Sequence, residues 1–268
     1  MDRILVEWSY LIFTTLSETV NTFHSKFTRR FNLEQLSKLQ FGPQQLCNGV
    51  KIRNLIAEFI GSLLLAGAVV GSGIMATNLS NDVGVQLFIN TIATVFILIV
   101  LISILIDISG AHFNPAVTLS LFLRKQISGL LAVSYALSQA IGMIVGVILA
   151  NLMFDLRAIE FSSQDRGGVN LFLAEVIATA GLILVIHLLI DQEKKSTIPT
   201  AVAVWIGSAY FFTSSTSFAN PAITIARSLT DTFAGIAPRS VSMFLVAQLV
   251  GVLIGLGIAK LLRTRKVV

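Results

Sequence analysis

The sequence predicts an all-α membrane protein in which six transmembrane helices and two half-helices form an inverted repeat. Of its 268 residues, 54% are hydrophobic and only 12% are charged, and the mean hydropathy is +0.83. A soluble domain has about 25% charged residues, so this composition indicates a polytopic helical chain. Two tripeptides, Asn114-Pro115-Ala116 and Asn220-Pro221-Ala222, lie next to long apolar segments and indicate the half-helices.

The chain divides into an extension, a membrane domain and a short tail. Residues 1–52 are predicted to be an N-terminal cytoplasmic or interfacial extension, because their apolar stretch is too short to span a bilayer. No small-residue cleavage site marks a signal peptide there. The membrane domain is placed at 53–262, with repeat one at about 53–154 and repeat two at about 168–262. Residues 263–268 form a basic C-terminal tail.

Six apolar segments come close to the roughly 20 residues that a bilayer-spanning helix needs. We expect them at 53–76, 83–106, 128–154, 168–190, 197–214 and 239–261. The two half-helices are expected at about 114–123 and 220–230, between spans two and three and after span five.

Each tripeptide predicts the start of a helix at membrane depth. Asn is a preferred N-cap residue and Pro suits the first helical position. Loop residues precede both, and non-helical backbone at this depth is tolerated only if it is buried in protein or lines a watery cavity. Two such half-helices in one chain therefore suggest a pore.

Internal repetition supports a duplication of three spans plus one half-helix. A Gln followed by Gly three and seven residues later occurs in span three (Gln139) and again in span six (Gln248), and an Ala-Glu pair occurs in span one (Glu58) and span four (Glu175). An odd number of spans per repeat places the halves in opposite orientations. The paired glycines, Gly142/Gly146 and Gly251/Gly255, are small-xxx-small contacts that let spans three and six approach closely.

The distribution of Lys and Arg predicts the orientation. With both termini in the cytoplasm, only four of the 19 basic residues lie outside, namely Arg157, Arg166, Arg227 and Arg239. We therefore expect a multi-pass protein of the cell (inner or plasma) membrane with cytoplasmic termini.

The segment Ser109–Leu119 resembles the first signature of the aquaporin, or major intrinsic protein, family. The second NPA tripeptide, the duplication and the paired glutamates resemble that family too, over roughly residues 53–262. The resemblance implies an aquaporin-like bundle, half-helices that meet at the midplane, a channel in each protomer and a homotetramer in the lipid bilayer. The second half-helix is most similar to a bacterial aquaglyceroporin-like branch that carries neutral metalloid hydroxides.

The two asparagines have a physical role that can be argued from the half-helices. A helix N-terminus carries about half a positive charge, and two of them at the centre of a pore repel cations and protons. The side-chain amides of Asn114 and Asn220 can donate hydrogen bonds to a passing oxygen. Such donors orient water and interrupt a continuous proton wire.

The family's narrowest filter uses four positions, which the resemblance places at Thr94, Ser208, Ser217 and Ile223. Water-selective members have an aromatic residue, a His and an Arg among them, and this chain has none of the three at those places. The next Arg, Arg227, lies one helical turn beyond Ile223. We expect a wide, uncharged, hydroxyl-lined constriction with a cationic vestibule; a snorkelling Arg227 without a filter role is the alternative.

Such a filter should pass solutes larger than water, namely glycerol, urea or a neutral metalloid hydroxide such as arsenous acid. The family's glycerol facilitators have an Asp soon after the Arg of the second motif, which is absent here. The alternatives are a strict water channel, an ion-coupled secondary transporter, since inverted repeats also build those, and a non-conducting structural member.

The remaining polar residues of the spans receive structural interpretations first. Glu58 and Glu175 are expected to accept hydrogen bonds from the loop amides that precede each half-helix, although intramembrane carboxylates can also carry protons. His112 is expected to pack beneath the first half-helix, with a pH gate as the alternative, and His187 to lie at the interface.

We expect no enzyme, no cofactor, no metal site and no nucleic-acid partner. The hydropathy excludes a soluble enzyme, and no nucleophile–base set or His/Cys cluster is visible in the sequence. The single Cys47 excludes an internal disulfide.

Overall fold

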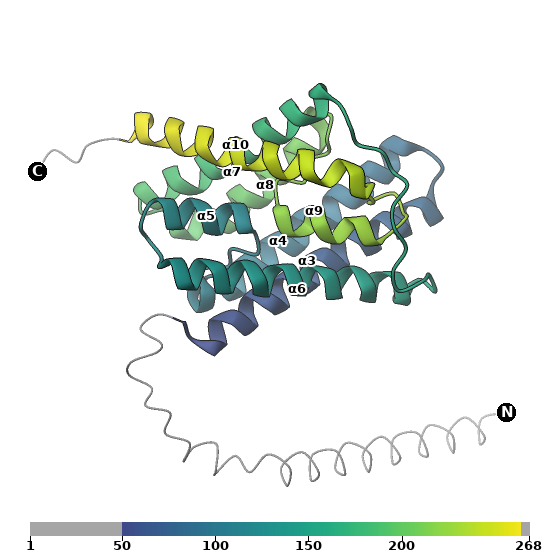
Figure 1. The fold of residues 1–268 in the computed structure, drawn as a ribbon, viewed down its shortest axis with the longest axis horizontal. Helices are drawn as coiled ribbons and strands as arrows, with labels where there is room; N and C mark the ends of the chain where they lie inside the picture. The colour runs from purple at the N-terminus through teal and green to yellow at the C-terminus, as the bar shows by residue number, and fades with distance from the viewer. Residues whose placement is uncertain (1–49, 264–268) are drawn as a thin grey trace, which may run out of the picture. The chain divides into compact units, whose positions relative to one another are not determined.

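The computed structural model describes residues 50–263, drawn in colour in Figure 1. The predicted N-terminal extension and C-terminal tail therefore lie almost entirely outside the described residues. The division into an extension, a membrane domain and a tail stays a prediction.

The described residues form six long helices and two short ones. The first repeat contains α3 (Ile52–Leu79), α4 (Val83–Ser109), the short α5 (Pro115–Leu123) and α6 (Gly129–Met153). The second contains α7 (Val169–Asp191), a 3-10 turn η1 (Lys195–Thr197), α8 (Ile198–Phe212), the short α9 (Pro221–Ala226), a 3-10 turn η2 (Arg227–Leu229) and α10 (Pro238–Leu262).

Every predicted span and half-helix coincides with one of these helices. Five helices, α3, α4, α6, α7 and α10, are long and apolar enough to cross a membrane. The remaining predicted span, span five, is α8, which has 15 residues and is about 22 Å long at 1.5 Å per residue. It is preceded directly by η1, so the two together approach the bilayer core of about 30 Å.

The helix ends follow from local sequence signals. Asp82 caps α4, since its carboxylate accepts a hydrogen bond from the Val85 amide at 2.9 Å. Gly110 ends the same helix with φ +92°, in the left-handed region that glycine occupies without strain. Ser128 caps α6 through the amide of Leu131. These polar residues mark the span boundaries that hydropathy alone leaves open by a few residues.

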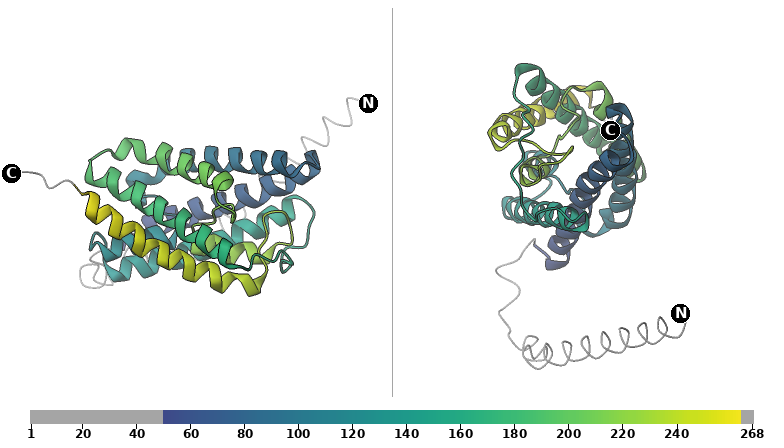
Figure 2. Two further views of the ribbon diagram at one scale, coloured as in Figure 1. Left: turned by 90° about the horizontal axis from the view of Figure 1, so that it is seen from above. Right: turned by 90° about the vertical axis from the view of Figure 1, so that its right-hand side faces the viewer.

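The two short helices lie in the middle of the bundle. In Figure 1, α5 and α9 lie roughly in one line, with α7 and α10 on one side and α3 and α6 on the other. The views in Figure 2 show the long helices running side by side around them. Within each repeat the first and last long helices pack together, α3 with α6 and α7 with α10.

The paired glycines serve these within-repeat contacts. A Cβ added to Gly142 or Gly146 of α6 would collide with the backbone carbonyls of Phe59 and Leu63 in α3. In the same way, a Cβ added to Gly251 of α10 would lie 2.8 Å from the carbonyl oxygen of Val176 in α7. A Cβ added to Gly255 would lie 2.5 Å from that of Ala180. The small-xxx-small motifs thus bring spans three and six against the first span of their own repeat.

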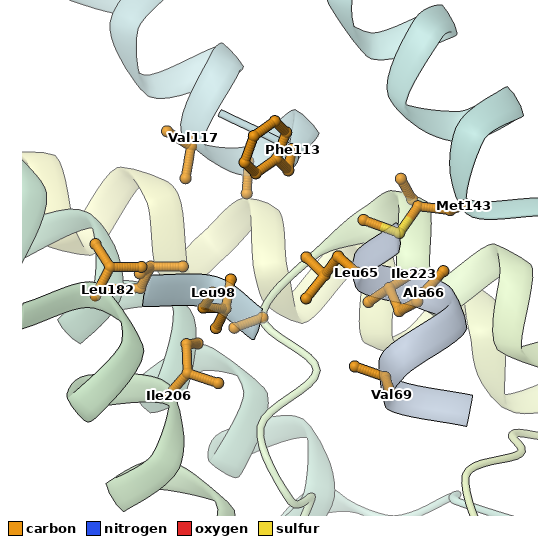
Figure 3. Packing of buried hydrophobic residues seen from close by; sticks show 14 of the residues in the cluster. Leu65, Ala66, Val69, Leu98, Phe113, Val117, Met143, Leu182, Ile206 and Ile223 are labelled. Atoms are coloured by element: carbon orange, nitrogen blue, oxygen red, sulfur yellow. The ribbon is translucent and has the colours of Figure 1, made fainter. Parts of the chain in front are cut away.

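Apolar side chains from all six long helices and both half-helices fill the space between the helices. Figure 3 shows Leu65 and Val69 of α3, Met143 of α6 and Val117 of α5 among them. Large apolar side chains also cover the outer surface, as expected for helices in contact with lipid.

Gly255 and Gly257 offer a matched test of this packing, because they lie two residues apart on α10. Gly255→Ala should destabilise the protein by about 1–3 kcal/mol, since the new methyl group meets the α7 backbone. Gly257 has no atom within 4 Å of an added Cβ, so Gly257→Ala should be neutral or stabilise the helix by up to about 1 kcal/mol. Thermal unfolding in detergent measures both; equal midpoints would contradict the proposed helix contact.

Candidate functional site

The two Asn-Pro-Ala tripeptides begin the half-helices as N-caps. The side-chain oxygen of Asn114 accepts a hydrogen bond from the amide of Ala116 at 2.8 Å. That of Asn220 accepts one from the amide of Ala222 at 3.0 Å. Pro115 and Pro221 occupy the first helical positions, where no amide hydrogen is needed.

The same asparagines join the two half-helices tip to tip. The side-chain nitrogen of Asn114 donates to the carbonyl of Ala219, and that of Asn220 donates to the carbonyl of Phe113, both at 2.8 Å. Each amide nitrogen carries two hydrogens, so one N–H of each remains for another partner. Both side chains line a common cavity.

The loops that lead to these tips have unusual backbone conformations. Ala111 and Phe113 in the first loop have φ of +50° and +47°, and Ser217 and Ala219 in the second have +51° and +45°. Residues other than glycine reach this left-handed region at a cost of roughly 1–3 kcal/mol each. The loops therefore need strong external contacts.

Two buried glutamates supply those contacts. Glu58 of α3 accepts hydrogen bonds from the amides of His112 and Phe113 at 3.0 and 2.7 Å. It also accepts from the hydroxyl of Ser109 at 2.6 Å and the amide side chain of Gln139 at 2.8 Å. Its side chain is completely buried and does not line the cavity.

Glu175 of α7 repeats this arrangement in the second half. Its carboxylate accepts from the amides of Phe218 and Ala219 at 2.8 and 2.9 Å, and from Gln248 at 2.7 Å. Gln248 also donates to Thr224 of α9, as Gln139 does to Thr118 of α5. The duplicated Glu and Gln residues thus tie each half-helix to two long helices.

His112 lies where the first loop turns into α5. Its Nδ1 is 3.0 Å from the hydroxyl of Thr118, and its ring meets Tyr135 edge-on with centroids 5.2 Å apart. It also lines the cavity. These contacts fix the loop beneath α5.

His187, expected at the membrane interface near the end of its span, is fully buried within the protein. Its Nδ1 lies 2.9 Å from a guanidinium nitrogen of Arg124, which can only donate. The Nε2 atom is 2.8 Å from the hydroxyl of Ser120. Arg124 also pairs with Asp191 at 2.7 Å. Hydropathy could not distinguish a histidine near a span end from one that anchors a half-helix.

The cavity has a volume of about 590 Å³ and extends past both asparagines. Asp107, Lys195 and Ser196 line it near the end of α4 and the start of α8, and Thr94, Tyr210 and Arg227 line it beyond the half-helix tips. One set of lining residues is apolar: Leu98, Ile102, Val117, Leu182, Ile186, Val202 and Ile206. The lumen thus combines an apolar wall with polar side chains at both ends and at the half-helix tips.

Ser208 does not lie at the filter position predicted for it. Its side chain is exposed on the outside of α8 and does not line the cavity. Val202, Ile206 and Tyr210 form the lumen-facing side of this helix instead, at intervals of four residues. Tyr210 therefore places an aromatic ring in the cavity beside Thr94, where the sequence-based filter had none.

Thr94 lies opposite Tyr210. Its hydroxyl donates to the carbonyl of Asn90 at 2.8 Å, which leaves its oxygen to accept from the hydroxyl of Tyr210 at 3.4 Å. Ser217 and Ile223 also line this part of the cavity. The hydroxyl of Ser217 has no hydrogen-bond partner among residues 50–263.

Arg227 is a buried lining residue rather than part of an open vestibule. Only 3% of it is exposed, and its guanidinium lies 3.5 Å from the ring centroid of Phe218. Its Nε donates to the carbonyl of Ala234, which is its only side-chain hydrogen bond within the described residues. Arg227 lines the same cavity as Ile223, and the expectation of an uncharged constriction with a cationic vestibule stays a prediction.

The loop between α6 and α7 covers this end of the bundle. Hydrogen bonds from Arg239 and Ser240 lower the pKa of Asp165 below its ordinary value. Burial lowers the pKa of Arg166 from its ordinary value.

The sequence analysis gave no role to Phe218 or Arg166. The signal that could have pointed to Phe218 is its place in the run Ser217-Phe218-Ala219, directly before the second tripeptide.

No group of three or more His, Cys, Asp or Glu side chains that could hold a metal ion occurs among residues 50–263. The polar groups of the cavity are instead hydroxyls, amides and single charges, which can bind neutral polar molecules transiently.

The sequence profile described as Major intrinsic protein matches residues 46–219. The chain is 44% identical over 208 residues to "Aquaglyceroporin AqpS" of Rhizobium meliloti (strain 1021), covering 78% of this chain and 89% of that protein. It is 31% identical over 163 residues to "Probable aquaporin TIP2-2" of Oryza sativa subsp. japonica, covering 60% of this chain and 66% of that protein.

A solved structure shares the fold. The X-ray structure of the aquaglyceroporin from Plasmodium falciparum matches with a TM-score of 0.56 and 23% identity, covering 77% of this chain and 94% of that one. The expectation of an aquaporin-like all-α bundle is confirmed. On the sequence match over most of the chain and on this fold, the protein is a member of the major intrinsic protein family.

Proposed function

We propose that the chain is a passive channel for water and small neutral solutes such as glycerol, which pass along the cavity between the half-helices. The joined tips carry this proposal, because both asparagines line the lumen and keep one N–H each for a passing oxygen. The N-termini of α5 and of the α9–η2 segment place partial positive charge at the same point. Neutral molecules can cross this point, whereas cations and protons are repelled.

The composition of the constriction favours solutes larger than water. Ile223 and the ring of Tyr210 offer apolar contact, while Thr94, Ser217 and Arg227 offer hydrogen-bonding groups. A polyol can place its carbon chain against the first set and its hydroxyls against the second. The similarity to a protein named an aquaglyceroporin supports the same choice over a strict water channel.

Neutral metalloid hydroxides such as arsenous acid are further candidate substrates. They resemble polyols in presenting several hydroxyls without charge, so the same hydroxyl and guanidinium groups would bind them. Urea fits for the same reason, since it is small, neutral and polar.

An ion-coupled transporter is the less favoured alternative. It would need an ion-coupling carboxylate at the midplane, for which Glu58 and Glu175 are the candidates. Glu58 and Glu175 are completely buried, lie outside the lining of the cavity, and accept hydrogen bonds from loop amides. Their positions favour the structural role expected from the sequence.

The proposed assembly is a homotetramer in the cell (inner or plasma) membrane, with both termini in the cytoplasm. The family resemblance suggests the tetramer. The orientation rests on the excess of Lys and Arg at one end of the bundle, where α3 begins and α10 ends.

Flux through vesicles tests the channel itself. Purified protein in liposomes should accelerate water and glycerol movement over empty vesicles, without saturation and without response to an ion gradient. Stopped-flow light scattering measures both solutes, and arsenous acid provides the third comparison. Dependence on an ion gradient would favour the transporter, and no acceleration would favour a non-conducting member.

Variants at Tyr210 and Ser208 test which of these two α8 residues belongs to the filter. Tyr210→Ala removes a bulky ring from the lumen, and the wider path should help glycerol more than water. The ratio of glycerol to water permeability should rise about fivefold, which corresponds to about 1 kcal/mol in the barrier. Ser208→Ala is the matched control on the outer face and should leave both permeabilities unchanged. The reverse result would restore Ser208 to the filter.

Restoring an arginine directly after the second tripeptide should narrow the constriction. Ile223→Arg adds a long cationic side chain to the lumen and should suppress glycerol and arsenous acid at least about threefold more than water. Ile223→Leu keeps volume and apolarity and serves as the control. Equal losses for all three solutes would contradict the assignment of Ile223 to the filter.

A further inference from the structure

Phe218 is the common contact of two arginines. Its ring is buried, and the guanidinium carbons of Arg227 and Arg166 lie 3.5 and 5.2 Å from the ring centroid. Phe244 of α10 meets the ring edge-on, with centroids 5.0 Å apart. The ring is therefore fixed from the α10 side, and it attracts both cations through its π-system.

Both guanidinium groups also bind one short stretch of backbone. The Nε atom of Arg166 donates to the carbonyl of Gly235 at 2.8 Å, and its Nη2 atom donates to that of Phe233 at 3.4 Å. Arg227 donates from Nε to the carbonyl of Ala234, which lies between these two in the chain. Three consecutive carbonyls thus accept from two arginines.

The two arginines reach this point from different parts of the chain. Arg227 follows α9, whereas Arg166 belongs to the loop before α7. The backbone amide of Arg166 donates to the hydroxyl of Ser240, which in turn donates to Asp165. Arg166 itself does not line the cavity.

We propose that Arg166 is a positioning residue for the solute filter, and that it acts by keeping the terminal N–H groups of Arg227 in the lumen. By binding the carbonyls of Gly235 and Phe233, Arg166 leaves Arg227 a single backbone acceptor. Without Arg166, both carbonyls become available, and Arg227 turns toward them and away from the lumen. Repulsion between the two guanidinium charges near one ring also keeps Arg227 directed toward the lumen while Arg166 is present.

The inference rests on the proposed channel function and concerns its selectivity. A guanidinium that projects into the constriction offers planar donors to a polyol and limits the width. Once Arg227 turns aside, the gain in width outweighs the lost donors, because Thr94 and Ser217 still offer hydroxyls. Glycerol should then pass more easily relative to water, and the barrier to cations should fall.

A double-mutant cycle tests whether Arg166 acts through Arg227. Arg166→Gln, Arg227→Gln and the double variant are compared in vesicles by the ratio of glycerol to water permeability. Arg166→Gln should raise the ratio at least about threefold, and it should have no further effect in the Arg227→Gln background, because coupled neighbours are not additive. Arg157→Gln changes an exposed arginine of the same loop and is the matched control.

The conservative variant separates charge from geometry. Arg166→Lys keeps the charge but lacks the planar fork that contacts the ring and two carbonyls, so it should resemble Arg166→Gln. An unchanged ratio for Arg166→Gln, equal losses of both permeabilities, or effects that add in the double variant would overturn the proposal.

A structure of the Arg166→Gln variant gives a readout that does not depend on flux. The guanidinium of Arg227 should move toward the carbonyls of Gly235 and Phe233, and an unmoved Arg227 would overturn the positioning role. If wild-type vesicles transport no faster than empty ones, the proposed channel function fails, whereas the structural test of Arg166 still stands.

Discussion

Two buried carboxylates hold the centre of the molecule together. Glu58 and Glu175 lie in an apolar bundle, where removing an ion from water costs several kcal/mol. Loop amides, a hydroxyl and two glutamine side chains offset this cost by donating to them. The hydrogen bonds of the carboxylates also offset the backbone strain of the left-handed loop residues. They pair loop amides that would otherwise have no partner. The cross-linked asparagines and the lumen beside them depend on those loops.

The frame of the molecule could be predicted from sequence because its signals are local. The start of each half-helix depends on one Asn and one Pro, and span ends depend on nearby polar residues such as Asp82 and Ser128. The duplication was visible because Glu58 and Gln139 make the same contacts as Glu175 and Gln248. Such buried polar pairs tolerate few residue types, so both copies are recognisable.

The constriction could not be predicted as well, because it depends on how loops of unknown shape direct distant side chains. The resemblance placed the filter at Ser208, but the loop from Thr213 to Ala219 contains three left-handed residues, whose shape residue counting does not supply. Tyr210, not Ser208, lines the cavity. Arg227 likewise follows a change from α-helix to 3-10 helix, which no counting of α-helical turns can anticipate.

The two loops share one scaffold but differ where selectivity is expected. Counted from each Asn, His112 and Phe218 hold the same place, and each meets one ring edge-on, Tyr135 or Phe244. His112 binds the hydroxyl of Thr118 within its own half-helix. Phe218 offers no hydrogen-bonding group, and its π-system binds guanidinium groups from two other segments. One difference at a repeated position therefore distinguishes the second loop, which gathers two arginines, from the first, whose contacts stay close to its own half-helix.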